Sequence, residues 1–465
     1  MKGFLNFEQI EYVLFHLNNH ITLNSGIRES LVFIKSPVEI SEHPGKIIFI
    51  LSEKELRLNE IVYINGIPVL FPNSSEKQFF YFQNGNIIFN HDLFKSVFYL
   101  LSGYQECNNQ ELDSFGRFLS TSSIQSKLKI NNKPVVNYYF AEIIEGIEEF
   151  CLTHNLEFKK REQSGIFTFF LTHDVDRIKY FNINSLLYTI KILFRQKKDR
   201  KKNIDIIKEI FRIAFHIINI FDNKDPFWNF EELTKKEKEL EICSTYFFLP
   251  KDQKHVDSYY NIDDKKIGKL IEMLKKEGNE IGLHGTVRSH TSLETLSKIV
   301  TDFLKATKLK KTGIRQHRLM WQHPLTAINH NIAGISYDST LGFADHEGFR
   351  NSYCHPFKLF DFENNLILSY WEIPLNVMDS TLFYYRKLST EEATEAVSTI
   401  LKEIKKFNGV FTLLWHNSYF NESDVPGITD FYNNLLGSIT AEKPEILTGL
   451  DIISKFEFSS CNDKS

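Results

Sequence analysis

The chain has 465 residues, with 55 Lys and Arg against 59 Asp and Glu, which gives a formal net charge of −4. This length suggests two or three domains, and the nearly balanced charge argues against a strongly basic nucleic-acid-binding protein. Hydrophobic residues make up 42% and charged residues 25%, a globular composition that excludes wholesale disorder. The 42 Phe and 19 Tyr fit either a Phe-rich core or aromatic-lined pockets.

The cysteines and the N-terminus exclude further classes. The five cysteines are scattered without C-x-x-C spacing, so neither a disulfide framework nor a thiolate metal site is indicated. The N-terminal stretch carries Glu8 and Glu11 and has no small-residue cleavage site, unlike a signal peptide. No run of 18 or more uncharged apolar residues indicates a transmembrane helix. We therefore expect a cytoplasmic protein.

Residues 1–160 are predicted to form a smaller mixed α/β domain. Asn65-Gly66 is a hairpin signal, because both positions of a tight hairpin turn favour positive φ. We expect strands at 47–51 and 61–70 and helices at 91–103 and 138–154. Because no catalytic pattern is visible in this segment, it is interpreted as an accessory domain of unknown role.

Residues 161–465 show a regular alternation of strands and helices. The predicted strands are the apolar or aromatic runs 166–172, 244–250, 280–284, 313–317, 334–339, 368–374 and 410–416. Most are separated by helix-like segments such as 263–277, 292–308 and 390–406. Strands that alternate with helices indicate a parallel sheet, and seven of them indicate a closed or nearly closed (β/α) barrel.

Polar residues stand at the C-terminal ends of nearly all these predicted strands. In chain order they are Asp174 and Asp176, His284, Arg315 and His317, Asp338, Glu372, and His416. In a parallel barrel these strand ends share one rim, so residues far apart in sequence meet at a single site. This placement is the strongest indication within the sequence that the chain is an enzyme.

Asp174 and Asp176 form a D-x-D pair. Residues two apart on an extended strand point the same way, so both carboxylates can face one site. One can bind a metal while the other accepts a proton from water. An isolated pair of this kind can instead cap a loop.

His284 and His290 are candidate imidazole ligands. Two histidines with one aspartate leave an open position for water and substrate, as in catalytic zinc sites. Six residues separate them, which is not the helical i, i+4 spacing, so His290 must reach back from a loop. The alternatives are a buried core histidine at position 284 and a surface loop histidine at 290.

The remaining candidates act on protons or on substrate. Arg315 can orient a carboxylate base and depress its pKa, bind an acidic sugar, or form a structural ion pair. His416 can protonate a departing amine or be a core histidine. Residues at or near the expected rim are candidates for substrate binding: His317, Asp338, Glu372, Trp371 and Trp415.

These motifs resemble those of the polysaccharide deacetylases, the NodB-like group of carbohydrate esterase family 4. Thr172-His173-Asp174-Val175 stands where the family has T-F-D-D, and His284 begins an H-x-x-x-H motif whose fifth position is Arg288. Arg315 resembles the arginine of the third motif, and Leu414-Trp415-His416 matches the terminal L-x-H. The resemblance covers about residues 165–455. The segment Leu100–Glu106 also resembles a region found ahead of such barrels in bacterial proteins of unknown role.

The resemblance implies a distorted seven-stranded NodB-type barrel with a divalent metal, expected to be zinc. Asp174 would be the catalytic base, and His416 would protonate the leaving amine. Asp176 would take the metal-binding role in place of Val175, and His290 would supply the second imidazole. The implied reaction is removal of N-acetyl or O-acetyl groups from a cell-envelope or O-antigen-type glycan, by attack of water activated at the metal.

Two other functions remain open at this stage. Val175 and Arg288 depart from the family motifs, which would fit a catalytically inactive glycan-binding module on a degenerate barrel. Paired carboxylates would also allow a hydrolase of another bond, such as a cyclic amide or a glycosidic bond. The histidines and Arg315 favour metal-assisted amide hydrolysis over glycoside hydrolysis.

An insertion at about 178–227 separates the first two predicted strands. Two apolar stretches, 185–194 and 204–221, flank a turn, and residues 191–202 contain seven Lys or Arg and one acid. Such a hairpin fits peripheral contact of residues 185–221 with an anionic membrane, at the inner face, and a lipid-linked saccharide substrate. The alternative is a lid that packs on the barrel.

Overall fold

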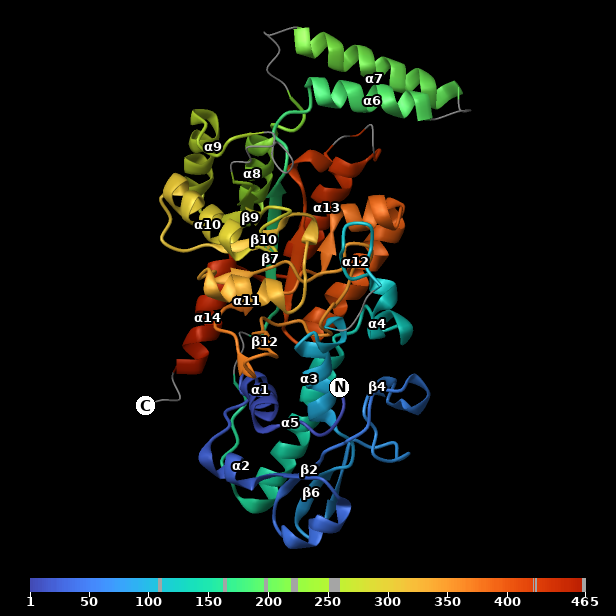
Figure 1. The fold of residues 1–465 in the computed structure, drawn as a ribbon, viewed down its shortest axis with the longest axis vertical. Helices are drawn as coiled ribbons and strands as arrows, with labels where there is room; N and C mark the ends of the chain where they lie inside the picture. The colour runs from blue at the N-terminus through green and yellow to red at the C-terminus, as the bar shows by residue number, and fades with distance from the viewer. Residues whose placement is uncertain are drawn as a thin grey trace.

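The computed structural model describes residues 1–107, 111–161, 165–195, 200–218, 225–250, 260–420, 422 and 425–461. The molecule is elongated: the N-terminal region forms one end, a large parallel sheet with its helices the middle, and a helical hairpin the other end (Figure 1). Within the described residues, no helix is long and apolar enough to cross a membrane.

The N-terminal region contains a four-stranded sheet in the order β1-β2-β6-β5. Its strands are β1 Leu31–Ile34, β2 Ile47–Ile50, β5 Phe80–Gln83 and β6 Asn86–Phe89, and its α-helices are α1 Phe7–Leu17, α2 Ser25–Ser30, α3 Leu93–Leu101, α4 Ile124–Lys127 and α5 Val135–His154. A Cβ at Gly146 of α5 would lie 2.6 Å from Phe89, so glycine allows this close packing. The hairpin predicted at Asn65-Gly66 is confirmed as β3 Val62–Ile64 and β4 Ile67–Val69.

The larger sheet has eight parallel strands in the order β14-β11-β10-β9-β8-β7-β16-β15, and β17 also pairs with β7. Their bounds are β7 Thr168–Val175, β8 Ser244–Phe248, β9 Glu280–Gly285, β10 Gly313–Gln316, β11 Tyr337–Asp338, β14 Trp371–Glu372, β15 Val377–Met378, β16 Val410–Leu414 and β17 Glu445–Ile446. The parallel strands expected for a distorted, closed or nearly closed seven-stranded barrel are confirmed, with two differences. The segment after Glu372 adds a strand, β15, and among the described residues the terminal strands β14 and β15 do not pair, so the sheet is curled but open.

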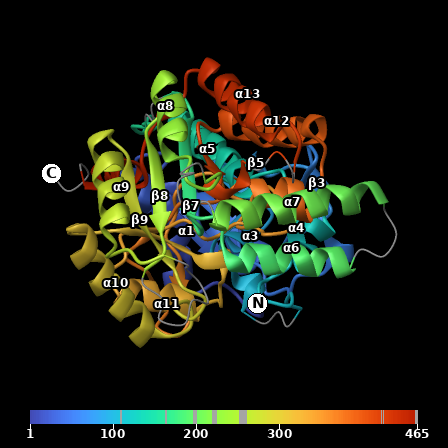
Figure 2. The same cartoon turned by 90° about the horizontal axis from the view of Figure 1, so that it is seen from above.

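Helices flank this sheet, whose central strands are buried and therefore read as continuous apolar runs in the sequence (Figure 2). They are α8 Phe230–Glu239, α9 Lys265–Lys276, α10 Leu293–Thr307, α11 Leu325–Ile332, α12 Thr390–Lys406, α13 Ile428–Ala441 and α14 Gly449–Cys461. The hairpin at the end of the molecule consists of α6 Ile183–Arg195 and α7 Arg200–Ile218. The three helices predicted from periodicity are confirmed as α9, α10 and α12. A small hairpin, β12 Phe360–Asp361 and β13 Leu366–Ile367, faces the N-terminal region.

The two parts of the chain share a hydrophobic core. Tyr12 and Phe98 of the N-terminal region contact Phe360 of β12 edge to face, with ring centroids 5.4 and 5.1 Å away. A buried ion pair joins Arg350 to Glu106 through two contacts of 2.9 and 2.7 Å. The domain boundary near residue 160 stays a prediction, and in this structure the N-terminal region packs closely on the rest.

Candidate active site

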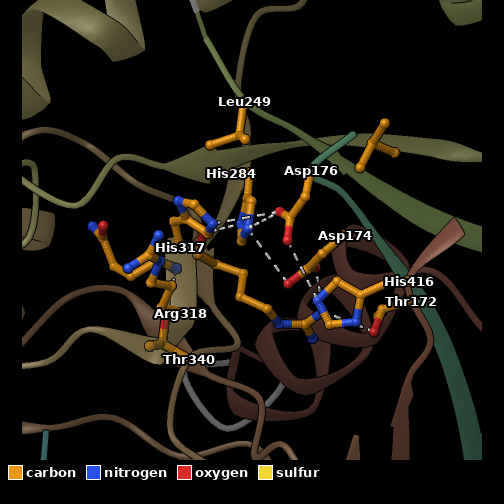
Figure 3. A network of polar contacts seen from close by, with 12 residues as sticks. Thr172, Asp174, Asp176, Leu249, His284, His317, Arg318, Thr340 and His416 are labelled. Atoms are coloured by element: carbon orange, nitrogen blue, oxygen red, sulfur yellow. Dashed lines mark hydrogen bonds and ion pairs between the residues drawn. The ribbon is translucent and has the colours of Figure 1, made fainter. Parts of the chain in front are cut away.

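The end of β7 presents alternate residues to opposite sides. Thr172 and Asp174 face the candidate site, and Asp176, directly beyond the strand, faces it too (Figure 3). His173 points the other way, where it stacks on Tyr246 and its Nε2 contacts a Glu237 carboxylate oxygen at 2.9 Å. Val175 is fully buried in the apolar core behind the strand. Because alternate side chains of a strand point to opposite sides, Asp174 and Asp176 face the site and His173 and Val175 do not.

Asp176, His284 and His317 form a cluster with the composition of a metal site. Their ligand atoms all lie within 4.8 Å of one another. Oδ1 of Asp176 is 3.2 Å from Nε2 of His284 and 3.7 Å from Nε2 of His317. In a tetrahedral zinc site, ligands 2.0–2.2 Å from the ion lie about 3.3–3.6 Å apart, and the two spacings measured from Asp176 are close to this range.

Two atoms of this cluster face each other without a well-formed hydrogen bond. Oδ1 of Asp176 and Nε2 of His284 are buried and 3.2 Å apart as an ion pair, and within the described part of the chain neither makes a hydrogen bond of normal geometry. Poorly satisfied buried polar atoms cost free energy, which a bound cation would offset. The carboxylate and imidazole donors, their spacing and these two atoms together fit a divalent metal ion.

The tautomer of His284 also suits a ligand. Its Nδ1 lies 2.8 Å from the backbone carbonyl oxygen of Arg315, which can only accept, so Nδ1–H donates. The lone pair is then on Nε2, the atom that faces Asp176. A ring nitrogen that donates to a carbonyl in this way fixes the orientation of a metal-binding histidine.

The charges of the cluster depend on one another. Burial alone would raise the pKa of Asp176, but the neighbouring His317, His284 and His416 lower it well below its ordinary value. Burial would likewise lower the pKa of His284, but Asp174 and Asp176 raise it above its ordinary value. The raised pKa values of His284 and His416 reflect nearby negative charge, including that of Asp174 and Asp176. A divalent cation would balance this negative charge with neutral imidazoles.

Arg315 fixes Asp174 and is not available to substrate. It is fully buried, its Nη1 donates to Oδ1 of Asp174 at 3.0 Å and to the Thr172 hydroxyl at 2.8 Å, and its Nε and Nη2 donate to Ser339. The guanidinium also lies 4.6 Å from the ring centroid of Phe247. With each nitrogen engaged by the protein, Arg315 holds the Asp174 carboxylate in a fixed orientation.

His416 lies across the site, paired with Asp379. Nδ1 of His416 donates to Oδ1 of Asp379 at 2.8 Å, and Nε2 lies 3.8 Å from Oδ2 of Asp176. Burial would lower the pKa of His416, but Asp379 together with Asp176 and Asp174 raises it to about 10. The sequence reasoning missed Asp379. Asp379 directly follows the two-residue strand β15, which is too short to be detected in the sequence as a strand.

One predicted ligand lies outside the cluster. His290 is half-buried in the loop before α10, and its backbone oxygen accepts a hydrogen bond from Thr326. His317, predicted as a substrate-binding residue, takes the third place beside Asp176 and His284. His317 follows the neighbouring strand β10 directly and needs no loop to reach the site, so the structure places it where the sequence predicted His290, and the role of either residue as a metal ligand stays a prediction.

Four predicted substrate-binding residues are buried. Asp338, Glu372, Trp371 and Trp415 are each at most 1% exposed. Trp415 alternates with His416 along the chain and therefore packs against Tyr432 of α13, with ring centroids 4.9 Å apart. Glu372 lies beside Asp338, and burial with that neighbouring charge raises its pKa well above the ordinary value. These residues belong to the interior in this structure, which corrects their expected place at the rim.

Comparison with known proteins gives one family-level match. Residues 5–152 match a family of unknown function, DUF7033. No curated protein matches the chain.

Solved structures resemble the chain weakly. A protein described as a polysaccharide deacetylase from Mycobacterium smegmatis has 17% identity and a TM-score of 0.42, over 65% of this chain and 93% of its own. A 4-α-glucanotransferase from Thermococcus litoralis has 13% identity and a TM-score of 0.38, over 62% and 40%. A pseudoenzyme of carbohydrate esterase family 4 from Bacillus anthracis has 8% identity and a TM-score of 0.30, over 62% and 65%. Function is therefore inferred from the geometry of the site itself.

Proposed function

We propose that the chain is a metal-dependent hydrolase that removes acetyl groups from an amino sugar or sugar ester of a glycan. The observation that carries the proposal is the Asp176–His284–His317 cluster, flanked by a carboxylate on one side and an imidazole on the other. Each flanking group is held by a partner of opposite charge, so the arrangement separates a base from an acid across one site.

Asp176, His284 and His317 would hold the ion. A divalent metal bound there supplies Lewis acidity, which polarises an acyl carbonyl and lowers the pKa of a water molecule. Asp174, held by Arg315 and buried beside the cluster, accepts the proton of the attacking water. The hydrogen bond from the Arg315 guanidinium to Oδ1 fixes the orientation of this carboxylate beside the cluster.

His416 supplies the proton to the leaving group. Its Nδ1–H is committed to Asp379, so Nε2 is the atom that faces the site. Asp379 favours the protonated imidazole, and donation from Nε2 to a departing sugar nitrogen or oxygen completes the hydrolysis. Asp174 thus accepts a proton from water, and His416 donates a proton to the leaving group.

The substrate class is inferred from the motifs together with the site. The D-V-D, histidine and terminal L-W-H elements resemble those of polysaccharide deacetylases, which supports an N-acetyl or O-acetyl group on an envelope or O-antigen-type glycan. Val175 and Arg288 depart from those motifs, which favoured an inactive glycan-binding module. Val175 lies in the core, but Asp176 faces the site in its place. Arg288 is exposed, but His317 joins the cluster, so three potential metal ligands are still present.

The test is acetate release from N-acetylated and O-acetylated glycans by the purified, metal-loaded protein. Asp174→Asn keeps the size of the side chain and an acceptor for Arg315, so we expect it to fold and to lose about 10²–10⁴-fold in kcat/KM. Asp302→Asn on the exposed side of α10 is the control. Full activity of Asp174→Asn would refute the mechanism, and glycan binding unaffected by chelator, without acetate release, would support the inactive module.

A further inference from the structure

The α6–α7 hairpin is the part of the chain that the proposed chemistry does not use. The two helices pack antiparallel on each other and stand away from the sheet at the end opposite the N-terminal region (Figures 1 and 2). Their inner faces are covered, as Thr189 of α6 and Ile213 of α7 are 9% and 0% exposed. The lid that packs on the barrel, expected as an alternative, is not what the described residues form. Residues 196–199 and 219–224 lie outside the described part.

The outer face of α7 is apolar and open to solvent. Ile204, Ile207, Phe211, Phe215 and Ile218 recur every three or four residues, which places them in one stripe, and they are 42–79% exposed. A helix of a water-soluble protein normally turns such a stripe toward a core. An exposed contiguous apolar stripe of this kind marks an interaction surface.

Apolar side chains on α6 enlarge this exposed surface. Ile183, Leu187 and Phe194 repeat at intervals of four and seven residues and are 57–77% exposed, with Tyr188 beside them at 66%. Across all described residues, 23 large hydrophobic side chains are exposed, and nine of them belong to these two helices. The apolar surface is therefore concentrated on the hairpin, unlike the scattered exposed residues elsewhere.

The charge of the hairpin identifies its partner. Residues 183–218 contain nine Lys and Arg against three Asp and Glu, a net charge of +6 in a chain whose net charge is −4. Lys191 and Lys208 are exposed on the two helices. A second copy of this hairpin would bring +6 against +6, so self-association is electrostatically unfavourable. A partner that accepts apolar side chains and carries dense negative charge is an anionic lipid surface.

The base of the hairpin is joined to the candidate active site. Asn417, next to His416, donates to the backbone oxygens of Arg177 and Phe227, on the two segments that lead into and out of the hairpin. Asp225 accepts from the backbone N–H of Tyr180 at 2.8 Å, which ties the same two segments together. The hairpin is thus fixed at the carboxyl ends of the strands, where the catalytic groups lie.

We propose that the α6–α7 hairpin docks on an anionic lipid surface, with its apolar stripe at the acyl boundary and its basic residues at the headgroups. Docking at this end of the molecule brings the strand ends close to the lipid. As an extension that rests on the proposed function, the glycan substrate is one carried on a lipid, whose sugar lies at the headgroup level.

The test is co-sedimentation of the full chain with vesicles of phosphatidylcholine containing about one third phosphatidylglycerol, and with phosphatidylcholine alone. We expect binding to the anionic vesicles, weakened by added salt because salt screens the headgroup attraction. Phe211→Ser with Phe215→Ser should lower the partition coefficient about tenfold or more. The matched control is Phe7→Ser with Leu152→Ser, which removes side chains of equal exposure (70% and 74%) from the N-terminal region and should bind like wild type.

A charge variant tests whether the basic residues of the hairpin bind the lipid headgroups. Lys208→Glu on the hairpin should weaken binding to anionic vesicles, whereas Lys235→Glu, exposed on α8, should not. Equal binding to neutral and anionic vesicles, or unchanged binding of the double Phe variant, overturns the proposal. So does a wild-type dimer in light scattering that the double Phe variant converts to a monomer, because the stripe would then cover a second copy.

Failure of the docking proposal and failure of the proposed hydrolase are distinguishable. Sedimentation needs no turnover, so Asp174→Asn should bind vesicles like wild type. Acetate release from a water-soluble acetylated oligosaccharide needs no vesicle and should be unaffected by Phe211→Ser with Phe215→Ser. Vesicle binding without acetate release would refute the proposed hydrolase and leave the docking proposal. Acetate release without vesicle binding would refute the docking proposal and leave the hydrolase.

Discussion

His317→Ala tests the third member of the proposed metal site. The sequence predicts His290, whereas Nε2 of His317 lies 3.7 Å from Oδ1 of Asp176. We expect His317→Ala to weaken binding of Zn²⁺ strongly, because Asp176 and His284 would remain as a two-donor set. Loss of a hydrogen-bonding partner behind a ligand costs about 10–100-fold in metal affinity, so loss of a ligand should cost at least about 100-fold, or about 2.7 kcal/mol.

His290→Ala provides the matched control, since it deletes the same side chain from the loop nearby. Competition titration of Zn²⁺ against a chromogenic chelator measures both affinities, and circular dichroism checks that both variants are folded. The expected result is wild-type affinity for His290→Ala and the large loss for His317→Ala. If His290→Ala shows the larger loss, or if the two variants weaken binding equally, the cluster deduced from the structure is wrong.

Three further changes test the site and its support. Asp379→Asn should lower kcat/KM about 100-fold or more, because His416 loses the carboxylate that favours its protonated form; the pH–rate profile should shift as well. Glu106→Gln leaves the Arg350 guanidinium buried without its partner and should lower the free energy of unfolding by about 3–5 kcal/mol in urea titrations. His16 is fully buried, and burial lowers its pKa to about 3. As the pH falls below 6.5, the unfolded chain therefore gains a proton at this residue and the folded chain does not. The free energy of unfolding should fall by about 1.4 kcal/mol per pH unit between pH 6 and 4 because of this residue, and His16→Gln should remove that contribution.

The polar residues at strand ends were the predictable part of the site. Asp174, Asp176 and His416 follow long apolar or aromatic runs, and His284 ends the shorter run 280–284, so the sequence locates these strands. Parallel strands align their carboxyl ends, so finding the strands is enough to bring these side chains together. No knowledge of the loops is needed for that step.

The residues that were misplaced depend on short strands or on loops. Asp379 follows β15, which is two residues long and has no periodicity to detect. His290 was chosen because it follows His284 in the sequence, but the cluster at Asp176 contains His317 instead. Trp371 and Trp415 were expected at the rim because they adjoin polar strand-end residues. Neighbours on a strand face opposite sides, so adjacency to a site residue favours burial behind the sheet.

The N-terminal region contributes to the site through the turn that follows His317. Arg318 and Leu319 have positive φ values of 61° and 53°, a strained conformation that the surrounding structure must hold. Arg117 of the N-terminal region donates to the backbone oxygen of Arg318 at 2.9 Å and is itself fixed by Asp113. Because His317 belongs to the same turn, its position beside Asp176 depends on this contact. A region without catalytic residues of its own therefore helps to place a metal ligand, which gives a physical reason for its close packing against the sheet.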